Sequence, residues 1–241
     1  MSDLSLVETT RLELRFAPKR WEFAEARRAE IDAYFAELKR ARPALWNGRV
    51  LVLHDWTLES GVFRGAYLET DFASFIAWRD WGFPDPNVRN SFAMAALQAS
   101  DGAFVLGVMG AHTANAGKVY FPCGTPDPHD IAGGMVDLDG SVRRELMEET
   151  GIDASNLEVE PGWTTVFAGP RIAQIKLLRA RETASVLRDR IRAHLAEEAE
   201  PELTDIRIVR GEADLHPMMP DFVSAFLRHR WAGRREGPAL A

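Results

Sequence analysis

Apolar residues recur along this chain at strand and helix spacings, so the order of its elements can be predicted directly. In the first third, alternation predicts a strand at 12–16, a helical stretch at 18–40, β-rich runs at 50–53 and 62–68, and a helix at 71–81. Asp71 is placed to cap the last of these. The apolar stripe of the long helix is typical of a packed core face, not of a cofactor site; it consists of Phe23, Ile31, Tyr34, Phe35 and Leu38, with Trp21 near the start.

The proline-rich run WGFPDPN, residues 81–87, predicts a boundary between an N-terminal extension and a larger domain. Beyond it the pattern predicts strands at 89–98, 103–109, 118–121, 163–167, 171–178 and 205–209, and helices at 182–198 and 217–231. The last helix presents an apolar face made by Met219, Phe222, Val223, Phe226 and Leu227. We therefore expect an α/β (α+β) fold with an extension at 1–87, a main domain at 88–232 and a flexible tail at 233–241.

One stretch, VRRELMEETGI at residues 142–152, concentrates charge on a predicted helix. At about 3.6 residues per turn, the carboxylates of Glu145, Glu148 and Glu149 share one face, and Val142 and Leu146 mark the neighbouring inward face. The helix has plausible ends as well, since Asp137 suits its N-cap and Gly151 suits its left-handed C-terminal residue.

An acidic helix face alone does not require a ligand. Like charges at this spacing destabilise an isolated helix by only about 0.2–0.5 kcal/mol per pair. A solvated surface with an Arg144–Glu148 ion pair is therefore the simpler interpretation of the triplet. The full string, however, is more specific than its charges.

The run RELMEETGI resembles the C-terminal half of the Nudix box, G-x5-E-x7-R-E-U-x-E-E-x-G-U, where U is a bulky aliphatic residue. The matching residues are Arg144, Glu145, Leu146, Glu148, Glu149, Gly151 and Ile152. The N-terminal half departs from the pattern: if Gly124 is the box glycine, Asp130 stands in place of the box glutamate. Gly124 to Arg144 is then 20 steps where the pattern has 14, which implies six extra residues in the loop before the helix.

The resemblance implies a Nudix α/β/α sandwich with a mixed sheet, preceded here by an N-terminal α/β extension, and a divalent cation, Mg²⁺ or Mn²⁺. It assigns Glu145 and Glu149 as central metal ligands, with Glu148 sharing a metal or acting through water. Arg144 would orient a glutamate, and a backbone carbonyl at Gly124 or its neighbour would complete the coordination.

Other site residues stay open at this stage, because each is also an ordinary surface residue. The general base is either Glu145 or a later acid, and the later candidates are Glu197, Glu198, Glu200 and Glu202. Arg171 and Lys118 are the first candidates for substrate contacts. His112 and His129 lie in loops before the acidic helix and are further candidates for binding phosphate.

Composition narrows the functional class. The 241 residues are 46% hydrophobic, which is enough for a real core, and a net charge of −7 gives no basic footprint for an extended nucleic acid. The single cysteine, Cys123, excludes an internal disulfide and a multi-cysteine zinc site. Without a signal-like N-terminus or a long apolar segment, we expect a soluble cytoplasmic protein with no membrane partner.

We thus expect a metal-dependent diphosphatase acting on a small nucleoside diphosphate derivative, releasing a nucleoside monophosphate. The long extension and enlarged loop favour a nucleotide sugar or an ADP-ribose-like substrate over a nucleoside triphosphate, and the N-terminal layout is loosely similar to Nudix proteins that hydrolyse UDP-sugars. The alternatives are a catalytically weak nucleotide-binding or regulatory module and an isoprenoid diphosphate isomerase using Cys123. A homodimer is compatible with the sequence.

Overall fold

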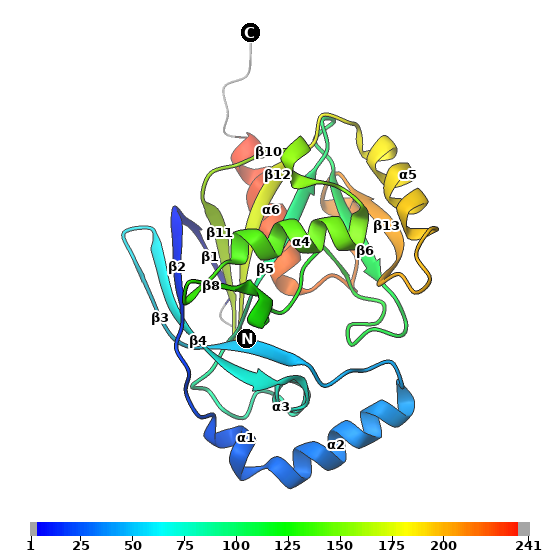
Figure 1. Ribbon diagram of the computed structural model, residues 1–241. Helices are drawn as coiled ribbons and strands as arrows, with labels where there is room; N and C mark the ends of the chain where they lie inside the picture. The colour runs from blue at the N-terminus through cyan, green and yellow to red at the C-terminus, as the bar shows by residue number, and fades with distance from the viewer. Residues whose placement is uncertain (1–3, 236–241) are drawn as a thin grey trace.

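Two β-sheets organise residues 4–235, the part of the chain that this computed structural model describes (Figure 1). The larger sheet has the order β1 (Leu4–Thr9), β11 (Trp163–Ala168), β12 (Arg171–Arg179), β5 (Asn90–Gln98), β6 (Phe104–Met109) and β13 (Leu203–Val209). Two short strands extend it, with β10 (Glu158–Val159) beside β12 and β7 (Val119–Tyr120) beside β6. Because β5 and β12 run parallel among antiparallel neighbours, the sheet is mixed, as predicted.

The smaller sheet joins strands from both sides of the boundary predicted at residues 81–87. Its order is β3 (Arg49–Glu59), β4 (Val62–Asp71), β2 (Arg11–Phe16), β9 (Met135–Val136) and β8 (Ile131–Ala132). Strand β2 pairs with β9, and β1 of the larger sheet pairs with β11. The N-terminal region therefore contributes to both sheets, and its treatment as a separate domain ending at residue 87 stays a prediction.

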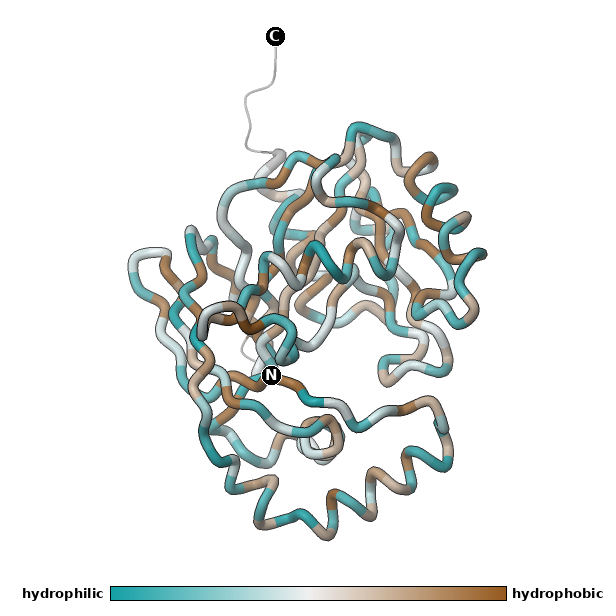
Figure 2. The backbone as a smooth tube through the Cα atoms, viewed as in Figure 1, coloured by the Kyte–Doolittle hydropathy of each residue, from teal (hydrophilic) through white to brown (hydrophobic). Residues whose placement is uncertain are grey.

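The helices cover the larger sheet on both faces and build a further layer below it (Figure 1). Helix α4 (Leu138–Thr150) packs on β5, and α6 (Asp221–Arg235) packs behind, against β11 and β1. Helix α5 (Ala184–Leu195) lies beside β13. The layer below contains α1 (Glu22–Ala26), α2 (Arg28–Ala41) and α3 (Phe72–Asp80). In Figure 2, brown segments, which mark hydrophobic residues, follow the strands between these layers.

The predicted helix at 18–40 is in fact two helices, because the backbone leaves helical geometry at Arg27 (φ −111°, ψ 19°). Because of this break, the apolar residues before and after Arg27 pack against different residues of α3. Trp21 packs edge-on against Trp78 of α3 with ring centroids 5.8 Å apart, while Ile31 and Phe35 are buried farther along α3.

The other predicted elements are present with shifted ends. Strands β3 and β4 are longer than predicted, because both continue through polar residues: β3 runs on to Glu59, next to the turn at Ser60 and Gly61, and β4 runs on to Asp71, opposite Arg49. The last helix starts at Asp221 instead of residue 217, because Pro220 precedes it. It continues to Arg235, so the first part of the predicted tail is helical, and residues 236–241 lie outside the described residues.

Candidate functional site

Helix α4 has the ends and the inward face that its sequence predicts. The Asp137 side chain accepts a hydrogen bond of 2.9 Å from the Gly140 amide, and Gly151 closes the helix in the left-handed region at φ +66°. Val142 and Leu146 are buried. These contacts fix the rotation of α4, and hence the direction of its carboxylates.

Glu149 and Glu145 point inward, not into solvent. Glu149 is only 5% exposed; its Oε1 accepts a hydrogen bond of 3.2 Å from the Cys123 amide, while its buried Oε2 has no hydrogen-bond partner among the described residues. Burial and the nearby Glu145 raise the pKa of Glu149 well above its usual value. Burial likewise raises the pKa of Glu145 to about 7, although Arg144 partly offsets the effect. The simple reading of a solvated acidic face is therefore wrong for these two residues.

The loop before α4 brings backbone atoms against the two carboxylates. It leaves the sheet where the Ala95 amide of β5 donates to Pro122 O at 2.9 Å, and then passes Cys123 and Gly124. A side-chain carbon added at Gly124 would overlap the carboxylate of Glu145. Any larger residue at position 124 would therefore move the Glu145 carboxylate from its present place.

Asp130, the residue in the position of the box glutamate, anchors Arg144. Its Oδ1 accepts a hydrogen bond of 2.6 Å from Arg144 Nη1, and its Oδ2 accepts one of 3.0 Å from the Asp127 amide. Arg144 also donates to Glu145 at 3.1 Å. Asp130 is 3% exposed, so this chain of contacts is buried at its base and holds Glu145 from one side.

The six extra residues of the loop form a small hairpin. Strands β8 and β9 occupy 131–136 and turn through Gly133 and Gly134, both with positive φ. The hairpin is closed at its base, because the Asp137 amide donates to Asp130 O at 2.8 Å. Without these six residues, Asp130 would precede Arg144 by eight positions, the spacing of the box pattern. The insertion thus extends the loop outward and leaves the residues at its base side by side.

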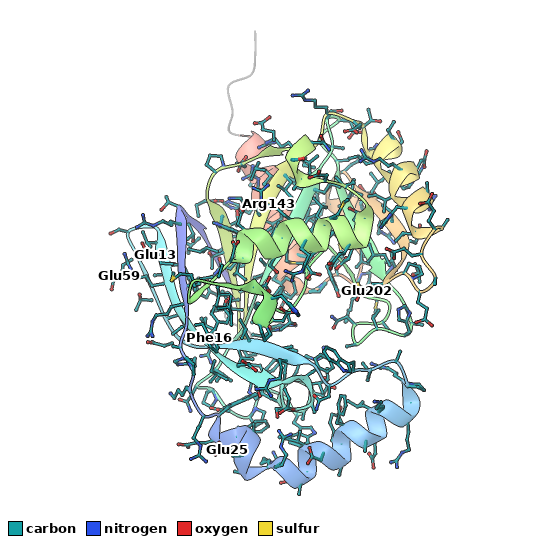
Figure 3. All side chains as sticks on the ribbon, in the orientation of Figure 1. Glu13, Phe16, Glu25, Glu59, Arg143 and Glu202 are labelled. Atoms are coloured by element: carbon teal, nitrogen blue, oxygen red, sulfur yellow. The ribbon has the colours of Figure 1, made fainter. Side chains whose placement is uncertain are left out.

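Of the four later acids, Glu202 is the one whose charge affects Glu145 and Glu149 on α4. It precedes β13 and lies below the C-terminal part of α4 (Figure 3). Its charge raises the pKa of Glu145 and of Glu149. Partial burial raises the pKa of Glu202 itself, and His112 opposes this rise. Glu198 instead pairs with His194 at 3.2 Å. All four acids are exposed residues, so the effect of Glu202 on the two acids of α4, not its exposure, distinguishes it.

A pocket of about 560 Å³ opens beside the acids. Cys123 and Gly124 form the end next to α4, and both predicted substrate-binding residues, Arg171 and Lys118, also line it. Sequence reasoning missed the rest of the basic and aromatic lining, which includes Arg42, Arg79, Phe75, Phe83, Phe92 and Phe222. The cations outnumber the single acid in the lining, Asp221, so the pocket suits an anionic ligand.

The extension supplies one wall of this pocket. Arg79 of α3 donates to Asn115 Oδ1 at 3.2 Å, and Arg42 donates to Thr113 O at 3.4 Å, so both hold the loop before β7. Phe83 has a positive φ of 60°, which costs about 1–3 kcal/mol at a non-glycine residue. The sequence does not show this backbone strain, just as it does not show the other aromatic residues of the pocket wall.

Three further candidates from the sequence, Glu148, His129 and Cys123, differ in their exposure and in their contacts. The Glu148 side chain is 63% exposed and lies 4.0 Å from Arg144, so its part in metal binding stays a prediction. His129 is 87% exposed and turned toward Asp127. The thiol of Cys123 is kept neutral, because burial and the nearby carboxylates raise its pKa.

The donor set fits a hard divalent cation. Within residues 4–235, no group of three or more histidine, cysteine, aspartate or glutamate side chains is arranged to enclose an ion. Mg²⁺, however, is commonly held by one or two carboxylates, with water and substrate phosphate completing its shell. The unpaired Oε2 of Glu149, the crowded Glu145 and the close backbone at Gly124 match that requirement.

The chain also has no helix, over the described range, that is long and apolar enough to cross a membrane.

Comparisons with known proteins find similarity only at the level of structure. No protein-family model and no curated protein sequence matches this chain. Solved structures that it resembles include the Nudix hydrolase RenU from M. smegmatis, with a TM-score of 0.39, 16% identity, and coverage of 63% of this chain and 88% of that one. A MutT protein from Methanosarcina mazei Go1 gives 0.40 and 19%, covering 61% and 96% of the two chains.

A bifunctional NMN adenylyltransferase/ADP ribose pyrophosphatase from Francisella tularensis, solved with AMP and a manganese ion, gives a TM-score of 0.40 at 13% identity. The match covers 66% of this chain and 45% of that chain. Nudix hydrolases are thus among the structural neighbours, as the motif predicts. Overlaps this loose assign neither a substrate nor a reaction to this chain.

Proposed function

We propose that this chain is a Nudix hydrolase that uses Mg²⁺ or Mn²⁺ to cleave the diphosphate linkage of a small nucleoside diphosphate derivative. The products would include a nucleoside monophosphate. The observation that carries the proposal is that half-buried Glu145 and buried Glu149 lie against Gly124 and Cys123, two residues that line a basic, aromatic pocket. The motif and this geometry point to the same residues.

The chain's own residues have distinct parts in this proposal. Glu145, Glu149 and the backbone at Gly124 would hold the cation, with Glu148 reaching it through water. Bound there, the cation would neutralise diphosphate charge and lower the pKa of an attacking water. Arg144, fixed by Asp130, would keep Glu145 in position. Arg171 and Lys118 would attract the anionic substrate from the pocket side.

Glu202 is the general base in this proposal. Its charge acts on both acids of α4, and the residue is exposed, so a water molecule can approach its carboxylate. Its raised pKa moves it toward neutral pH, which favours proton transfer. Glu145 is less suited to the task, because Arg144 donates to its carboxylate and Gly124 packs against it.

A panel of substrates tests the proposal. Nucleotide sugars, ADP-ribose, NADH, diadenosine polyphosphates and nucleoside triphosphates would be incubated with Mg²⁺, Mn²⁺ or EDTA, and nucleoside monophosphate release measured. We expect metal-dependent cleavage of a diphosphate-linked class and little cleavage of triphosphates. Metal-independent cleavage would contradict the role of Glu145 and Glu149. Tight binding without turnover across the panel would instead support a nucleotide-binding module.

A further inference from the structure

Two shielded polar atoms at the far end of the pocket have no hydrogen-bond partner among the described residues. They are Oδ1 of Asn90, an acceptor, and Nε of Arg171, a donor. Both residues line the pocket, and they are direct register partners at the start of the parallel strands β5 and β12. A donor and an acceptor therefore lie side by side, and a buried polar group without a partner is unfavourable unless a ligand or water completes it.

The floor of the pocket connects this pair to the acids. Asn90, Phe92 and Met94 alternate along β5 and all line the pocket, so they share one face of the strand. At ~3.3 Å per residue, Asn90 and Met94 are about 13 Å apart along β5. Ala95, next to Met94, bonds to Pro122 just before Gly124. A ligand with its phosphates at the acids would thus extend along β5 toward Asn90.

The surroundings of the pair favour a flat, aromatic group. The Arg171 guanidinium lies over the Phe222 ring at 5.4 Å from its centroid, and Phe222 meets Phe92 edge-on at 5.5 Å. Phe75 and Phe83 line the pocket from the extension. Aromatic faces stack on nucleobases, and amide and guanidinium groups pair with base edges that carry a donor beside an acceptor.

We infer that this end of the pocket is a nucleobase subsite, in which Asn90 accepts a hydrogen bond from the base edge and Arg171 Nε donates one to the neighbouring acceptor. Asp221, 3.5 Å from an Arg171 terminal nitrogen, helps to hold the guanidinium in place. The inference rests on the proposed function, which locates the phosphates at Glu145 and Glu149. Of the two residues proposed to attract the substrate, Arg171 would then contact the base and Lys118 the phosphates.

Binding without catalysis tests the subsite. In EDTA, calorimetry would compare the four common nucleoside 5′-monophosphates with ribose 5-phosphate on the wild-type chain. We expect at least one nucleotide to bind tenfold or more tightly than ribose 5-phosphate. In Asn90→Ala that preference should fall by about 5- to 150-fold, the range of a paired base contact, with ribose 5-phosphate affinity unchanged. The exposed Asn156→Ala is the matched control.

Arg171→Lys separates base recognition from phosphate binding. Lysine keeps the charge but lacks the Nε–H, so a base contact should be lost while ribose 5-phosphate still binds. No base-dependent binding in the wild type, or equal loss for both ligands in Asn90→Ala, would overturn the inference. Base-selective binding without hydrolysis would sink only the proposed function, and hydrolysis without base selectivity would sink only the subsite.

Discussion

Replacing Glu149 by glutamine should make the metal-free protein more stable while removing its activity. Burial and the neighbouring carboxylates raise the pKa of Glu149 on folding, so a charged Glu149 destabilises the metal-free fold at neutral pH, by about 1.36 kcal/mol for each pH unit of the rise. Glutamine fills the same volume, keeps an acceptor for the Cys123 amide and carries no charge. Its amide group, left partly unpaired, costs about 1–3 kcal/mol in return.

The net expectation for Glu149→Gln in EDTA is a higher Tm than that of the wild type, and each 1 kcal/mol gained corresponds to roughly 2–4 °C in a chain of this size. With saturating Mg²⁺ the order should reverse, since a cation at 100 times its Kd stabilises only the wild type by about 2.7 kcal/mol. Thermal melts with EDTA and with Mg²⁺, beside turnover assays, measure both effects, and exposed Glu158→Gln is the control. A variant that is less stable without metal yet keeps the full Mg²⁺ shift would show that Glu149 is structural.

Three further predictions use the same assays. Glu202→Gln should lower kcat by about 10²–10⁴-fold without moving the Mg²⁺-induced Tm shift, whereas exposed Glu197→Gln should retain activity; equal activities would exclude Glu202 as the base. Leu146→Ala should lower the free energy of unfolding by about 2–5 kcal/mol in urea, because Leu146 is fully buried, and a loss below 1 kcal/mol would contradict this packing. As pH rises from 4.5 to 7, the free energy of unfolding of the metal-free wild type should fall by up to about 3 kcal/mol relative to that of Glu145→Gln. The reason is that the raised pKa of Glu145 lets the folded state bind this proton more tightly than the unfolded state. Stability curves of the two proteins that run parallel with pH would refute this.

The sequence was most informative where the chemistry is local. The period of Val142 and Leu146 and the caps at Asp137 and Gly151 predict α4, and counting positions identifies Asp130 and the length of the insertion. These features depend on neighbours within one helix or one loop. The division at residue 87 and the roles of the site residues are of a different kind, and they stay predictions.

The pocket wall could not be predicted, because its parts meet only in three dimensions. Arg79 and Phe75 belong to α3, a helix that is apolar and buried on nearly every side, so its pattern indicates only core residues. Asn90 is simply the first residue of a strand. The same limit applies to Glu202, one of four acids with equal claims in the sequence. Only the start of β13 below α4 singles it out.

The short acid at residue 130 and the inserted hairpin are explained by the same contacts. Aspartate is one methylene shorter than the glutamate of the box pattern, so its backbone must lie closer to Arg144 to reach it. The 3-10 turn η1 (Pro128–Asp130), capped by Asp127, and the bond between Asp130 O and the Asp137 amide supply that approach. Because Asp130 is almost fully buried, a longer side chain at this position should disturb its contact with Arg144. The departure from the pattern is therefore compensated within the loop, and the support of Glu145 is preserved.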